Sequence, residues 1–154
     1  MTEDLLEAQE PSDKQQTVTL ELFDQGMITL FWDEIMLATN AMAKQDARTI
    51  ATFAGQLRKH QLIVMGAWVD EKLNGLAFLR PTSGTLFNDQ SLSIVGLYGE
   101  KMKLTHWRMA MDKLVAFARD SGFKRLVGVS TVPAIGAVAA ICKFTKLDYY
   151  VKDL

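Results

Sequence analysis

Positively charged side chains gather in one part of this sequence. Residues 101–146 contain nine Lys or Arg residues and two acids, a net charge of +7, whereas residues 1–16 contain five acids and one base, a net charge of −4. The complete chain of 154 residues has a net charge of only −1. A basic region in a nearly neutral protein indicates either a surface that faces an anion, such as a phosphate, a nucleic acid or an acidic partner, or a set of solvated helix faces.

Other residues with reactive side chains are few. His60 and His106 have no Cys, His or carboxylate at metal-ligand spacing, so we expect no metal site, and we expect His106 to be exposed near a helix start. Cys142 lies in an apolar stretch, which favours a packing role over that of a nucleophile. The sequence contains no Gly-x-Ser-x-Gly elbow, phosphate-binding loop or dinucleotide fingerprint. Nucleic-acid binding is not favoured, because basic and aromatic residues do not interleave.

Length and composition are those of one globular domain. The chain is 49% hydrophobic and 23% charged, and its single Cys cannot form an internal disulfide. No run of 18 apolar residues occurs and the N-terminus is acidic, so we expect no membrane span, no secretory signal and a cytoplasmic location. We expect a polar acidic tail over residues 1–16 and a single domain over residues 17–154.

Apolar patterning predicts alternating strands and helices. Strands are predicted over 17–23, 62–69, 73–79, 92–98, 124–130 and 148–153, with a break at Pro81–Gly84 after the third. Stripes at helical spacing predict two helices between the first two strands and one helix on each side of residues 124–130. The expected helix signals are an N-cap at Asp46, an N-cap at Thr105, an exit glycine at Gly122 and a first-turn proline at Pro133.

The predicted order is β-α-α-β-β-β-α-β-α-β, an α/β (α+β) chain with a mixed sheet and helices on both faces. Three stretches resemble the GNAT N-acetyltransferase family: residues 73–77 (Leu-Asn-Gly-Leu-Ala), residues 111–123 with their exit glycine, and residues 144–149, where the family has Tyr-x-x-x-Gly-Phe. The resemblance covers residues 17–154 and implies a sheet that splays open around acetyl-coenzyme A. The chain is also similar to small GNAT-like proteins of tailed phages.

The resemblance places a cofactor turn before the third predicted helix. The family holds the pyrophosphate of coenzyme A with Gln/Arg-x-x-Gly-x-Gly/Ala, because small residues let backbone N–H groups approach the phosphates. Counting back from Gly122 places Met102, Thr105 and Trp107 at the three motif positions, so both small residues are missing. We expect Trp107 either to project into the diphosphate space or to shift the start of the helix. Side chains around the turn could substitute in part; the cofactor-binding candidates are Lys101, Lys103, Thr105, Trp107 and Arg108.

The resemblance also identifies the positions of the catalytic acid and base. The Tyr that protonates the departing thiolate in the family corresponds to Phe144, which has no proton to donate. Tyr149 and Tyr150 are close in sequence, but we expect them to be strand aromatics. Glu100 follows the fourth predicted strand and is a weak candidate for the base.

Two functions follow from these residues. The favoured one is a GNAT-like protein with an eroded acetyl-coenzyme A site, a non-catalytic binding or structural module that takes no cofactor and binds a virion or host protein. The alternative is an active N-acetyltransferase that moves an acetyl group from acetyl-coenzyme A to an amine through a non-standard pyrophosphate site.

Overall fold

A computed structural model describes residues 17–42, 44, 46–83, 90–128, 133–146 and 152–154 of this chain. The acidic tail predicted over 1–16 lies outside these residues, and so does most of the strand predicted over 148–153.

Five strands form one mixed sheet in the order β1-β2-β3-β4-β5. The first four pair antiparallel in sequence order, and β4 pairs with β5 in parallel. A parallel pair needs a crossover connection, and a helix supplies it here. The strands are β1 (Val18–Leu22), β2 (Ile63–Val69), β3 (Lys72–Ser83), β4 (Gln90–Gly99) and β5 (Arg125–Gly128). Each overlaps a predicted strand.

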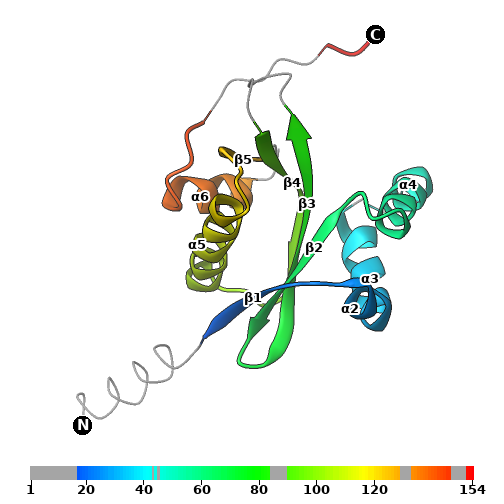
Figure 1. Ribbon diagram of the computed structural model, residues 1–154, viewed down its shortest axis with the longest axis horizontal. Coiled ribbons are helices and arrows are strands. Elements are labelled where there is room, and N and C mark those ends of the chain that lie inside the picture. The colour runs from blue at the N-terminus through cyan, green and yellow to red at the C-terminus, as the bar shows by residue number, and fades with distance from the viewer. Residues whose placement is uncertain (1–16, 43, 45, 84–89, 129–132, 147–151) are drawn as a thin grey trace.

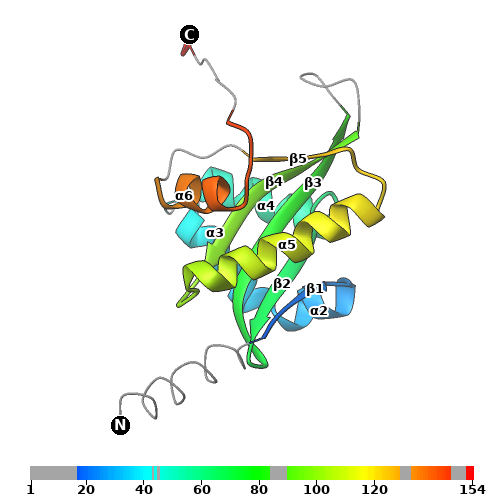
Figure 2. The same cartoon turned by 90° about the vertical axis from the view of Figure 1, so that its left-hand side faces the viewer.

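Helices cover both faces of the sheet, which confirms the predicted α/β architecture (Figure 1). Helices α2, α3 and α4 lie on one face, and α5 and α6 lie on the other. Figure 2 shows α5 running across the front of the sheet, with α3 and α4 behind it. The helices are α2 (Gln25–Leu30), α3 (Trp32–Met42), α4 (Ala47–Arg58), α5 (Leu104–Asp120) and α6 (Pro133–Ile141).

The first predicted helix, whose apolar stripe begins at Phe31, corresponds to α3, and the short helix α2 before it was not predicted. Phe31 separates α2 from α3. This residue has φ −103° and ψ 23°, outside the α-helical region. Its ring stacks on Phe23 and meets Trp68 edge-on, with centroids 5.6 Å apart in both pairs. Aromatic packing against the sheet therefore fixes the break between α2 and α3.

Two apolar cores lie on opposite sides of the sheet, and adjacent residues of β3 belong to different ones. Phe78 packs in the core beneath α3 and α4, with Ile35 and Leu57. Leu79 packs in the core beneath α5, with Leu92 and Leu114. Successive side chains of a strand point to opposite faces, and each such residue stabilises the fold by about 1.5–3 kcal/mol when fully buried.

Pro81 does not break the chain as expected, because β3 continues through it to Ser83. The register of β3 with β2 ends at the pair Leu79–Ile63, while its register with β4 includes the pair Pro81–Leu92. Pro81 thus lies beyond the end of β2. A proline fits such an open edge because no neighbouring strand on that side needs its missing N–H.

The cap predicted for the second helix is confirmed at Asp46. Its carboxylate accepts hydrogen bonds from the backbone N–H of Arg48 at 3.1 Å and from the hydroxyl of Thr49 at 2.7 Å. The bond from Thr49, followed by the bond from Arg48, lowers the pKa of Asp46 below its ordinary value.

We predict that Asp46→Ala lowers the thermal midpoint of unfolding at neutral pH. The folded pKa is depressed, so the stabilisation is present above the unfolded pKa and is lost as pH falls through the folded pKa. The difference between wild type and variant should therefore shrink on acidification, as measured by thermal melts across acidic pH. Asp46→Asn is the matched control, since the amide oxygen still caps the helix. A difference that is constant with pH would contradict this account.

Candidate functional site

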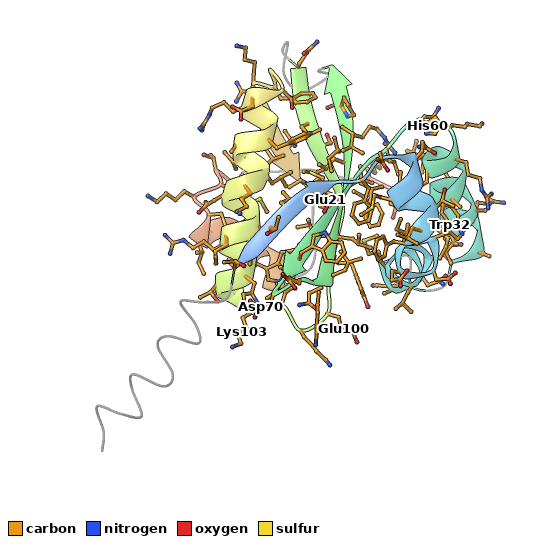
Figure 3. All side chains as sticks on the ribbon, turned by 60° about the horizontal axis from the view of Figure 1, so that its bottom comes forward. Glu21, Trp32, His60, Asp70, Glu100 and Lys103 are labelled. Atoms are coloured by element: carbon orange, nitrogen blue, oxygen red, sulfur yellow. The ribbon has the colours of Figure 1, made fainter. Side chains whose placement is uncertain are left out.

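The candidate site lies where β4 passes into α5. The connecting residues run from Glu100 to Lys103, and Lys101 adopts a positive φ of 60°. The backbone N–H of Glu100 donates to the carbonyl of Asn74 at 3.0 Å, which ties this turn to the neighbouring strand β3. Glu100, Lys101 and Lys103 are all exposed. Figure 3 shows Glu100 and Lys103 at one end of the molecule, together with Asp70.

Helix α5 begins earlier than its sequence predicts. Lys103 is the N-cap, whereas the predicted cap, Thr105, lies exposed in the first turn. His106 is buried, with 4% of its surface exposed, so the expectation of an exposed histidine is wrong. Its ring Nδ1 accepts a hydrogen bond from the backbone N–H of Lys103 at 3.1 Å, which stabilises the early start. The sequence spacing could have indicated that His106 is buried, because His106 precedes the buried Ala110 by one helical turn.

The side chain of Trp107 lies directly over the end of β4. A Cβ atom built on Gly99 would lie 2.5 Å from Cζ2 of this indole, a separation that real side chains do not tolerate. Gly75 pairs with Gly99 across the sheet, and its own Cβ would lie 2.5 Å from Sδ of Met102. The paired glycines form a patch of bare backbone, which we call the glycine patch, and Met102 and Trp107 cover it. Sequence reasoning missed the patch, because it gave no register between the strands predicted over 73–79 and 92–98.

Among the described residues, β5 pairs with the first half of β4. The register runs from Ser91–Arg125 to Ile94–Gly128, the last residue described before 129–132. The register of β4 with β3 shifts at Val95, which is an extra residue opposite Phe78 and Leu79. Such a bulge leaves backbone groups of the extra residue unpaired and increases the local twist. The sequence holds no sign of this bulge, since valine is an ordinary strand residue.

Arg108 lies beside the end of α6, where its charge reaches Cys142. Burial raises the pKa of the Cys142 thiol, Asp112 raises it further, and Arg108 lowers it. Cys142 is half-buried against the core beneath α5, as the sequence predicts for a packing residue.

Phe144 lies in the first residues after α6 and is half-buried against the same core. Its backbone N–H donates to the carbonyl of Ala139 at 2.9 Å, which closes the end of the helix. The ring therefore serves packing, and it offers no proton for acid catalysis. Tyr149 and Tyr150 lie outside the described residues.

In the described part of the chain, no three His, Cys, Asp or Glu side chains come together in a way that could hold a metal ion. None of the helices described is long and apolar enough to cross a membrane.

Comparison with known proteins reveals relatives in structure but not in sequence. No known protein family and no curated protein matches the sequence. An aminoglycoside N-acetyltransferase, AAC(6')-Iy, in complex with CoA superposes with a TM-score of 0.68 at 9% identity, over 90% of this chain and 95% of its own. A predicted acetyltransferase with acetyl-CoA from Clostridium acetobutylicum gives 0.65 at 13%, over 90% and 96%. The aminoglycoside acetyltransferase meta-AAC0020 from an uncultured soil sample, in complex with sisomicin, gives 0.66 at 13%, over 89% and 94%. The chain therefore has the fold of the GNAT acetyltransferases.

We predict that Gly99→Ala destabilises the protein by about 1–3 kcal/mol, because the added methyl group meets a rigid indole. The measurement is chemical denaturation followed by tryptophan fluorescence. The cost should fall sharply in a Trp107→Ala background, since contacting residues show non-additive effects. Gly128→Ala on β5 is the matched control, because its Cβ would lie 3.7 Å from the nearest atom. Additive effects of the two substitutions would show that the indole does not rest on Gly99.

Proposed function

We propose that this chain is a GNAT-fold protein whose acetyl-coenzyme A site is eroded, and that it acts as a non-catalytic binding or structural module. The observation that carries the proposal is the indole of Trp107 lying on the bare backbone of Gly99. The resemblance places the pyrophosphate of coenzyme A at this junction of strand and helix, so the side chain and the cofactor compete for one space.

The early start of α5 supports the same proposal. The backbone N–H of Trp107 donates to the carbonyl of Lys103 at 3.1 Å, so this donor belongs to the helix. In the family motif the corresponding residue is small and its backbone faces phosphate. Here the first helical turn occupies the positions that a glycine-rich turn would need.

The position of the catalytic acid supports it further. Phe144 packs against the core and carries no dissociable proton. Loss of a general acid slows a transfer reaction by a factor of about 10²–10⁴ without forbidding it. The missing acid alone would leave a slow enzyme, and the missing cradle argues against cofactor binding itself.

The alternative is an active N-acetyltransferase, and a specific observation favours it. A β-bulge at Val95 interrupts the register of β4 with β3, and a bulge of this kind leaves backbone groups of the extra residue outside the ladder. Similar structures contain CoA or a CoA-linked bisubstrate analogue. In this alternative, side chains of Lys101, Lys103 and Arg108 replace the glycine-rich turn, and Glu100 acts as the base.

The module we propose acts through a protein partner, either a virion component or a host factor. This part of the proposal rests only on the sequence resemblance to small GNAT-like proteins of tailed phages. A membrane or nucleic-acid partner is not part of the proposal. We propose that the protein is located in the host cytoplasm or in the virion.

The test is calorimetric titration with acetyl-coenzyme A. Wild type should give no binding heat at millimolar ligand. Trp107→Ala should give measurable but weak binding, because removing the indole opens the space over Gly99 while the backbone cradle is still missing. Circular dichroism checks that each variant is folded. Trp32→Ala is the matched control, since this half-buried tryptophan packs on the opposite face of the sheet. Micromolar binding by wild type would overturn the proposal and support the alternative.

A further inference from the structure

Helix α6 has an unusual surface for a helix on the outside of a protein. Its nine residues, Pro133–Ile141, include no polar side chain. Nevertheless Gly136, Ala137, Ala140 and Ile141 are exposed, the last with 38% of its surface accessible. A helix that is apolar on all sides is normally buried. Some further group is therefore expected to cover this face.

Positive charge lies at the C-terminal end of that apolar helix. Lys143 and Lys146 follow the helix directly, and Arg108 of α5 reaches Cys142 at the end of α6. All three basic side chains are exposed, and Asp112 contributes one negative charge nearby. We call this combination of apolar helix and basic end the α5–α6 surface. A complementary ligand combines apolar side chains with carboxylates.

One segment of this chain has that chemistry. Residues 1–16 carry five carboxylates against one lysine, and they include Leu5, Leu6 and Ala8. They are the most acidic part of the sequence, while the α5–α6 surface belongs to the most basic part.

The start of β1 places this segment within reach. Val18 packs in a small cluster with Val69 and Ala110 of α5, and Met102 lies against it. The carbonyl of Thr17 accepts a hydrogen bond from the backbone N–H of Asp70 at 3.3 Å. Figure 3 shows Asp70 and Lys103 together at the end of the molecule where β1 begins. The acidic segment is thus joined to the body beside the first turns of α5.

The length of the segment is sufficient. A chain of 16 residues spans at most about 50 Å, whereas α5, with 17 residues, is about 26 Å long. Attachment at one end of α5 gives the segment an effective concentration on the order of millimolar near this surface. A weak intrinsic affinity is then enough for substantial occupancy.

We propose that residues 1–16 bind the α5–α6 surface of the same chain, with their leucines on the apolar face of α6 and their carboxylates on the basic side chains at its C-terminal end. The contact goes beyond the eroded cofactor site, because it covers a different part of α5 and α6 and requires no coenzyme A. A partner that uses the same surface must first displace this segment.

Cys142 provides a readout, because it is the only cysteine and ends the apolar helix. The experiment measures its rate of reaction with an uncharged disulfide reagent, 4,4′-dithiodipyridine, in the full-length protein. The first variant combines Glu3→Gln, Asp4→Asn, Glu7→Gln and Glu10→Gln. If the segment covers the surface about four-fifths of the time, this variant should react about five-fold faster than wild type.

Two further variants of this chain distinguish docking of the segment from a general effect of net charge. Leu5→Ser combined with Leu6→Ser keeps every charge and should also accelerate the reaction. The matched control Glu21→Gln, Asp33→Asn, Glu34→Gln and Glu71→Gln removes four acids from outside the segment and should react like wild type. A synthetic peptide of residues 1–16, added to the first variant, should restore protection. Unchanged rates in the segment variants, or equal acceleration in the control, would overturn the proposal and leave the cofactor question untouched.

Discussion

The packing of Trp107 on the glycine patch is the contact on which the rest of the site depends. A large rigid side chain can approach the sheet this closely only because Gly99 and Gly75, paired across β4 and β3, have no side chains of their own. The contact holds the start of α5 against the strand that precedes it. The same contact occupies the space where the resemblance places the pyrophosphate of coenzyme A. In the function we propose, this one interaction both stabilises the helix start and opposes cofactor binding.

The junction between β4 and α5 keeps basic side chains that attract anions, but we propose that its shape does not fit a diphosphate. Lys101, Lys103 and Arg108 keep the region positive, but the backbone N–H of Trp107 is already bonded within the helix. Side-chain cations attract an anion over a distance without supplying a fitted set of donors. Such a surface suits a flexible acidic chain better than a compact diphosphate. The apolar, exposed α6 beside it favours a polypeptide with leucines among its carboxylates.

Much of the architecture could be predicted from sequence, because it follows from local patterns. Strand alternation, the carboxylate cap at Asp46 and the exit glycine at Gly122, with its φ of 88°, are short-range features that the structure confirms. The resemblance to the GNAT fold is confirmed as fold alone by the structural comparisons. The predictions of helix and strand boundaries failed where tertiary packing determines those boundaries. The short helix α2, which ends at the aromatic cluster around Phe31, was not predicted, and the end of β2 lets β3 continue through Pro81. Burial of His106 moves the start of α5 away from Thr105, although threonine is the better N-cap by propensity.

The central claim is that the indole of Trp107 remains on Gly99 when acetyl-coenzyme A is present. Nuclear Overhauser contacts between the ring protons of Trp107 and the α-protons of Gly99 measure this directly in solution. We predict that these contacts are strong in the free protein and persist unchanged at millimolar acetyl-coenzyme A. Their loss on addition of the ligand, together with new contacts between the ligand and β4, would contradict the account.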